Sequence, residues 1–232
     1  MKTVATAPVG KMDKSTFGEG EVERTEVLMR YRRLREISRK HGDAIVERLP
    51  KKTVLHWGKR IGLVGRKTFI ASTMEEMTLG FDLAVYSTRS GKISPVERYR
   101  RSSKFAVGSE DGLMLDAMCR SRFSLFLVKR RHSATGLILE DLLRQEEVWL
   151  MDEGLEQSAP DGVFLASRVT KPDAFHMTTG APIPMTLDAF ENVAAVFPFP
   201  DASLADGADA KFVETVYRSA IDHGLMDAVV IE

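Results

Sequence analysis

The sequence predicts an α+β protein: an N-terminal helical region, a small antiparallel β-barrel-like module, and C-terminal helices. Two observations lead to this class. Apolar residues first recur every three or four positions, which is typical of amphipathic helices. From Phe123 onward they form short runs separated by turn residues, which is typical of strands. We therefore expect a disordered arm over 1–20, helices over 21–121, the β module over 122–185, and helices with an acidic linker over 186–232.

The first helix is expected in "EVERTEVLMRYRRLREISRKHG", where Tyr31 and Leu34 belong to a regularly spaced apolar stripe. Gly42 is expected to end it, because glycine readily adopts the left-handed conformation of a C-terminal cap. A second helix is then expected over Asp43–Leu49, and a third near Lys51–Ile61.

Three later helices are marked by their first residues. Ser72 and Glu75 have the spacing of a capping box, in which each side chain satisfies a backbone amide of the first turn. Ser94 begins a stronger one, since Pro95 also suits the first helical position. Ser109 is followed by two acids, which favours a helix that continues to about residue 120.

Five strands are expected in the runs "FSLFLVKR", "GLILED", "EEVWLMD", "GVFLASRV" and "AFHMTT". Strands this short and closely spaced favour a strongly bent sheet or a half-open barrel. Thr186 then begins a helix, "FPFPDASLADGADA" reads as a linker, and a final helix ends at Gly224.

The net charge of zero conceals a strong polarity. Residues 1–131 contain 28 basic and 15 acidic side chains, whereas residues 132–232 contain 5 and 18. Such asymmetry indicates a surface for a polyanion or an acidic partner, or halves that neutralise each other within one molecule or across a dimer.

The sequence favours a cytoplasmic protein and gives no sign of a membrane span. Its apolar runs are much shorter than the 18 or more residues that a span requires. The first fifteen residues have no signal-peptide core, and a single cysteine, Cys119, fits a reducing compartment. Apolar neighbours at helical spacing predict that Cys119 is a buried structural thiol.

No cofactor or metal site is expected. "GLVGRKTF" at 62–69 has too few residues between its glycines for a phosphate-binding loop, and a strand follows it. "DASLADGADA" lacks the ligand positions of a calcium loop. The five histidines have no ligand spacing, and no cysteine pair accompanies them.

The basic helical half is the best functional candidate. We expect a non-enzymatic binding or adaptor protein that contacts nucleic acid or another polyanion through this face, because lysine and arginine on a helix neutralise phosphates without reading bases. The basic run at 129–131 is interpreted either as a charged, solvated hairpin end or as a phosphate contact. The candidate residues are Arg32, Arg35, Arg39, Lys51, Lys52, Lys59, Arg60, Arg66, Lys67, Lys129, Arg130 and Arg131.

Two alternatives stay open. The first is protein association, either as a homo-oligomer or with a charged protein partner. The second is a hydrolase-like enzyme with a site near Asp173 and His176, although the sequence shows no nucleophile elbow that would support it.

The order of "RFSLF", "GLILEDLLRQEEVWLMDEGL", "APDGVFLASR" and "MTTGAPIP", preceded by "MEEMTLGFDLAVYSTRSGKISPVERY", resembles an uncharacterised proteobacterial family over roughly residues 73–185. A core of the "FSLF…DLL…E" kind is similar to that of some bacterial proteins ending in a cysteine-rich SEC-C zinc motif. This chain has no such tail, so the resemblance implies a fold unit and no zinc site or catalytic residue.

Overall fold

The computed structural model describes residues 15–66, 68–88, 93–106, 108–197 and 210–224, with side chains from residue 23. Helix α1 (Ser15–Val46) is its longest element and begins inside the segment expected to be an arm. The expected end at Gly42 and the separate helix after it are wrong, because the helix continues without a break. Ile45, four residues beyond the buried His41, is itself buried and extends the same stripe into the core.

Four further helices and a small hairpin complete the N-terminal half. They are α2 (Lys51–Arg60), α3 (Met74–Tyr86), α4 (Pro95–Ser102), α5 (Glu110–Cys119), and the pair β1 (Val64–Gly65) and β2 (Thr68–Phe69). The capping box expected from Ser72 and Glu75 is wrong: the N-cap of α3 is Thr73, which accepts from the Glu76 amide at 3.1 Å, while the Glu76 carboxylate accepts from the Ser72 amide. The capping box at Ser94 and the cap at Ser109 are confirmed.

Five strands close into a barrel, which confirms the α+β class and all five expected strands. They are β3 (Arg122–Arg131), β4 (Leu137–Asp141), β5 (Glu146–Met151), β6 (Phe164–Thr170) and β7 (His176–Thr178). The long β3 pairs with β6 through its first half and with β4 through its second, past an irregularity between Val128 and Arg130. The expectation of an entirely antiparallel module is wrong for one pair, since β5 and β7 run parallel.

Around the barrel the strands follow the order β3-β4-β5-β7-β6, and β6 pairs with β3 to close it. Along the chain, helix α6 (Glu153–Ser158) connects β5 to β6. This connectivity is that of the OB-fold, a five-stranded Greek-key barrel. Helix α6 and strand β8 (Ile183–Met185), which extends the sheet beside β6, were not expected from the sequence. Helices α7 (Leu187–Val196) and α8 (Ala210–Asp222) end the described chain, while the expected linker lies largely outside the described residues.

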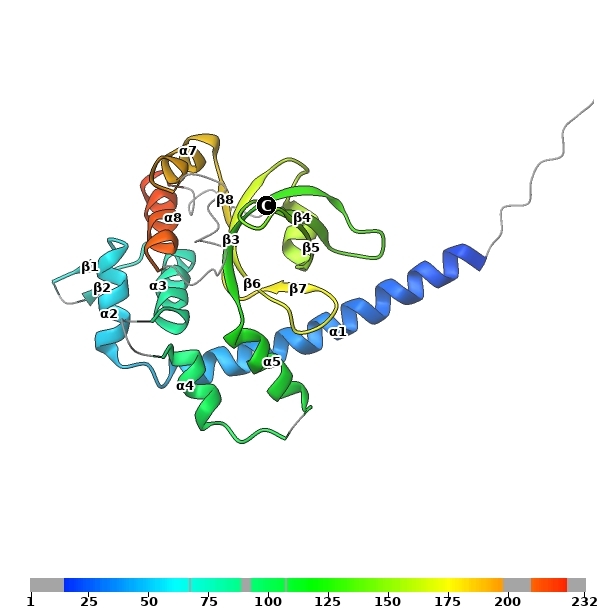
Figure 1. Cartoon of the computed structure of the whole chain (residues 1–232), viewed down its shortest axis with the longest axis horizontal. Helices are drawn as coiled ribbons and strands as arrows, with labels where there is room; N and C mark the ends of the chain where they lie inside the picture. The colour runs from blue at the N-terminus through cyan, green and yellow to red at the C-terminus, as the bar shows by residue number, and fades with distance from the viewer. Residues whose placement is uncertain (1–14, 67, 89–92, 107, 198–209, 225–232) are drawn as a thin grey trace, which may run out of the picture.

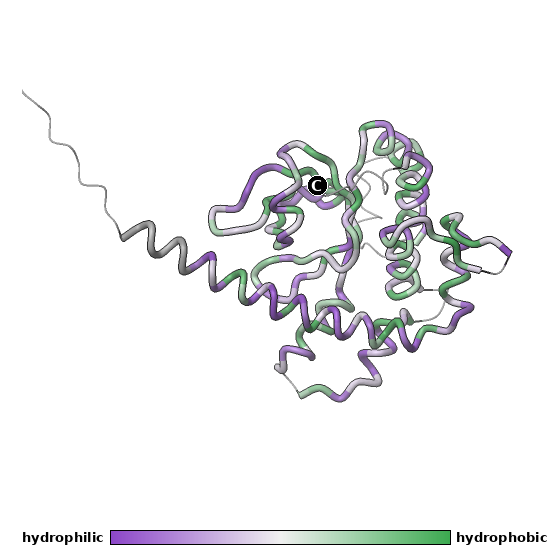
Figure 2. The backbone as a smooth tube through the Cα atoms, turned by 180° about the vertical axis from the view of Figure 1, so that it is seen from behind, coloured by the Kyte–Doolittle hydropathy of each residue, from purple (hydrophilic) through white to green (hydrophobic). Residues whose placement is uncertain are grey.

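Helices α2, α3, α7 and α8 gather on one side of the barrel, and α1 runs past both groups as a rod (Figure 1). The barrel interior is apolar and includes Phe126, Leu139 and Val148. A second cluster joins the outer barrel face to α2, α3, α7 and α8, and a third joins α1 to α5 and β7. Hydrophilic residues recur along much of α1 (Figure 2). The seven basic residues of α1 all lie between Arg24 and Lys40.

Candidate functional site

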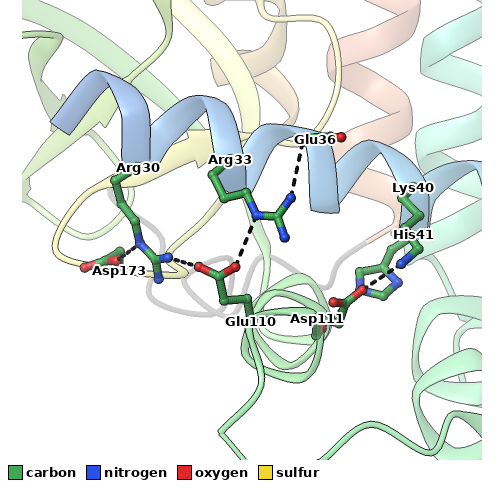
Figure 3. A network of polar contacts seen from close by, with 8 residues as sticks. All are labelled: Arg30, Arg33, Glu36, Lys40, His41, Glu110, Asp111 and Asp173. Atoms are coloured by element: carbon green, nitrogen blue, oxygen red, sulfur yellow. Dashed lines mark hydrogen bonds and ion pairs between the residues drawn. The ribbon is translucent and has the colours of Figure 1, made fainter. Parts of the chain in front are cut away.

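Most basic residues of α1 contact acids of other elements, and these acids come from both halves of the chain. Arg30 contacts Glu110 and Asp173, the latter at 2.8 Å, and Arg33 reaches Glu110 at 3.2 Å (Figure 3). The hydrogen bond from Arg30 lowers the pKa of Asp173, which stabilises the charged pair. Arg32 is also paired, with Glu153 at 2.7 Å.

Arg35 holds α1 to the end of strand β7. Its guanidinium donates to Thr178 Oγ1 at 2.8 Å, to Asp152 Oδ2 at 3.1 Å and to the Tyr31 hydroxyl at 3.0 Å. Its side chain is only 25% exposed. Because its donors are engaged by the protein itself, Arg35 is a structural link rather than a free phosphate ligand.

The predicted basic residues thus divide into two groups. Arg32, Arg35, Arg60, Lys129 and Arg130 each have an acidic partner within 4 Å, and Arg131 donates to two backbone carbonyls. Within the described part of the chain, no acidic partner contacts the exposed Arg39, Lys51, Lys52 and Lys59 or the loop residue Arg66, while Lys67 lies outside it. The two charged halves therefore pair extensively inside one chain.

The basic run at the end of β3 is built into the barrel. Lys129 binds Glu140 of β4 and Arg130 binds Glu147 of β5, both at 3.0 Å. His132 stacks on Trp149 with ring centroids 4.0 Å apart. These contacts favour the charged hairpin end over a phosphate contact.

Six of the cations that have no acidic partner among the described residues lie on or near α2, and we call these the α2 basic face: Arg48, Lys51, Lys52, Lys59, Arg66 and Arg98. A small groove between the end of α1 and α4 brings Arg48 and Arg98 together beside Pro50, directly before the two lysines. Arg48 also lies over the Tyr99 ring at 4.8 Å. The proximity of Arg48 to the lysines was visible in the sequence, but that of Arg98 depends on the packing of α4 and was missed.

A larger cavity of about 640 Å³ lies between α1, α3 and the segment after β7, and we call it the α1/α3 pocket. This volume is in the range of small-molecule sites. Its walls combine charged, hydroxyl and apolar side chains with two glycines: Arg35, Ser38, Arg39, Gly42, Asp43, Val46, Thr78, Phe81, Asp82, Val85, Tyr86, Met118, Asp152, Thr178, Thr179 and Gly180.

A buried ion pair lies beneath this pocket. Arg168 Nε donates to both carboxylate oxygens of Asp82, at 2.9 and 3.2 Å, and the Tyr217 hydroxyl donates to the same carboxylate at 2.7 Å. The Arg168 guanidinium also lies over the Tyr86 ring, 4.7 Å from its centroid. Burial raises the pKa of Tyr217 well above its usual value, so the phenol remains a donor. The network joins α3, β6 and α8.

The structure does not assemble the hydrolase site considered near Asp173 and His176. Asp173 binds Arg30 at the surface, whereas His176 is buried opposite Leu150 at the end of the barrel. Among the described residues, no hydrogen bond or ion pair joins the two. Burial lowers the pKa of His176 to about 4, so its imidazole is neutral at pH 7.

Cys119 is half-buried at the end of α5. Burial raises the pKa of the half-buried Cys119 thiol to about 11, which disfavours the reactive thiolate. In the described ranges no three histidine, cysteine or acidic residues are grouped as metal ligands. No described helix is both long and apolar enough to cross a bilayer.

Comparison with known proteins gives a family without an activity. Residues 25–190 match the model described as "Family of unknown function (DUF7986)". That range contains the barrel and every residue of the α1/α3 pocket, and it ends before α8. Neither the curated proteins nor the solved structures contain a match.

Proposed function

Because the chain belongs to DUF7986, a family of unknown function, we propose a function from its own geometry: it is a binding protein that holds a polyanion, such as nucleic acid, at the α2 basic face. One observation carries the proposal. The cations turned toward the barrel are neutralised, and Arg60 of α2 is paired with Glu214, whereas the six cations of the α2 basic face lack acidic partners among the described residues.

The spacing of these cations suits a phosphate backbone. Lys52 and Lys59 are seven residues apart and therefore lie on one side of α2, about 10 Å apart along its axis. That distance corresponds to roughly three base steps of a duplex. Lys51 and the groove cations Arg48 and Arg98 extend the positive surface beyond the start of the helix. Contacts of this kind position a backbone without reading its sequence.

The barrel itself supports this location indirectly. OB-folds commonly bind ligands on the face of their second and third strands, beside the first loop and the last one. Here α1 occupies that region: Arg24 donates to Ala134 in the first loop, and Tyr31 packs on Phe175 in the last. Trp149, which an open barrel would offer for stacking, packs in the α1 cluster. Because α1 covers the usual ligand face of the barrel, we place the polyanion on the side of the molecule where α2 lies.

The alternatives gain less support. Acids that would attract a basic protein, including Asp152, Glu153 and Glu156, are already bound by α1. Protein association through the acidic half would have to break these pairs. A hydrolase would need a catalytic group other than the separated Asp173 and His176.

The test is a salt titration of binding to labelled single- and double-stranded RNA and DNA, followed by fluorescence anisotropy. In the variant K51Q/K52Q/K59Q, three phosphate contacts are lost. We expect weaker binding to every sequence, and a log–log salt slope shallower by about 2 to 3.

The matched control is R32Q/K129Q/R130Q, which removes the same charge from cations that have acidic partners. We expect its affinity and salt slope to stay close to those of the unmodified protein. Equal loss in both variants would mean that only net charge matters, and no binding at physiological salt would overturn the proposal.

A further inference from the structure

The α1/α3 pocket contains five charged side chains, and three of them are satisfied by the protein. Asp82 accepts from Arg168 and Tyr217. Arg35 and Asp152 bind each other and share Thr178, whose hydroxyl donates to Asp152 at 2.7 Å. These groups form walls whose polar atoms already have partners.

The remaining two charges are Arg39 and Asp43, one turn apart on α1. Both are exposed, and neither has an ion-pair partner within 4 Å in the described part of the protein. Their charges are opposite, so a ligand with a single charge would be attracted by one and repelled by the other. A ligand with a carboxylate and an ammonium group close together would satisfy both.

The rest of the cavity suits an apolar group. Val46, Phe81 and Val85 line it from α1 and α3. Nothing lies within 4 Å of the place where a Cβ on Gly42 would stand, so this glycine leaves the space between the two charges open. Thr179 adds a buried hydroxyl oxygen that has no hydrogen-bond partner among the described residues. This hydroxyl lies near enough to Tyr86 to affect the pKa of the Tyr86 phenol.

We propose that the α1/α3 pocket binds a small zwitterion of the α-amino acid class, with its carboxylate on Arg39, its ammonium group on Asp43, and an apolar side chain toward Phe81 and Val85. The Gly42 gap admits the backbone of the ligand, and the volume of about 640 Å³ accommodates a side chain as large as that of phenylalanine. This site is separate from the α2 basic face and does not depend on polyanion binding.

Isothermal titration calorimetry and ligand-observed NMR with the full chain test the proposal. The probes are L-leucine and L-phenylalanine at millimolar concentration, each compared with its N-acetyl derivative, which lacks the ammonium group, and its amide, which lacks the carboxylate. We expect at least one amino acid to bind, and both derivatives to bind at least tenfold more weakly, because each derivative lacks one of the two charged groups assigned to Arg39 and Asp43.

Three variants locate the binding. R39Q and D43N should each weaken the amino acid at least tenfold, and G42F should abolish binding by filling the cavity. K40Q is the control, since Lys40 is the neighbour of Arg39 but binds Asp111 outside the pocket. The proposal fails if neither amino acid binds, if the N-acetyl derivative binds as well as the amino acid, or if R39Q binds like K40Q. Folding of each variant is checked by circular dichroism.

Discussion

At the scale of single residues, His176 shows how position decides ionisation. It lies directly opposite Leu150 in the parallel pair of β5 and β7, and therefore on the same face of the sheet as that barrel residue. Its Nδ1 atom has no hydrogen-bond partner in the described structure. Burial is the main cause of its low pKa, and the positive charge of Arg122 adds to it.

This lowered pKa predicts a specific dependence of stability on pH. The folded protein resists protonation of His176 down to about pH 4, whereas an unfolded histidine takes up a proton near pH 6.5. The contribution of His176 to the free energy of unfolding is therefore complete above pH 6.5 and is lost as the pH falls toward 4. The loss is roughly 3 kcal/mol at most.

Urea unfolding of the unmodified protein and of H176L at pH 7.5, 6 and 5 measures this effect. The difference in unfolding free energy between the two proteins should shift in favour of H176L as the pH falls. His41, whose pKa burial also lowers, contributes equally to both proteins and cancels. A difference that stays constant over this range contradicts the assignment.

The sequence could predict which basic residues lie on α1, but not which of them are free. Arg35 and Arg39 belong to the same predicted stripe and are one turn apart. Only the fold places Asp152 and Thr178, more than 110 residues away, against the first and not the second. The pairing of charges depends on long-range contacts that no local pattern encodes.

At the scale of elements, the residues that begin helices were predicted better than the residue expected to end α1. Side-chain caps at Ser94, Ser109 and Thr186 were found because a cap is a local hydrogen bond. Gly42 was interpreted as a stop because glycine suits a cap, yet tertiary burial of Ile45 carried the helix past it. The parallel pairing of β5 and β7 is set by barrel closure and left no mark on the sequence.

Two glycines inside helices should respond in opposite ways to the same substitution. In G42A the new methyl group meets nothing within 4 Å, so removing the flexibility of glycine should raise the unfolding free energy by about 0.5–1 kcal/mol. In G80A, on α3, the added Cβ would lie 2.5 Å from the Phe69 ring. This overpacking should lower the unfolding free energy by roughly 1–3 kcal/mol.

Thermal and urea unfolding of both variants provide the measurement. Each protein serves as the control for the other, since the chemical change is identical and both sites are helical. If G80A proves as stable as G42A, the Phe69 ring moves aside without cost and the tight packing of β2 on α3 is not a constraint.

At the scale of the whole molecule, one buried network joins three distant parts of the sequence. Asp82 and Arg168 have side-chain exposures of 4% and 5%, and Tyr217 completes the set from α8. Charges removed from water this thoroughly are tolerated only when paired, so this network requires helices from both ends of the chain to pack on the barrel together.

Removing the charge of one residue in this network should therefore lower the free energy of unfolding more than replacing all three residues with apolar ones. D82N leaves the Arg168 guanidinium buried without a counter-charge, and we expect a loss of about 3–5 kcal/mol in the free energy of unfolding. The apolar replacement D82L/R168M/Y217F removes the three buried polar groups of this network together, and its free energy of unfolding should be closer to that of the unmodified protein. Chemical denaturation measures both, and a D82N protein within about 1 kcal/mol of the original would show that water reaches the pair.

The charge pairing also has a consequence for synthesis. Arg24, Arg32 and Arg35 of α1 are paired with residues 117 to 132 positions further along the chain. At translation rates of about 5–20 residues per second, these arginines leave the ribosome roughly 6 to 26 seconds before their partners exist. During that interval residues 24–40, with seven basic and two acidic side chains, lack these partners, and synthesis of β5 and α6 supplies them.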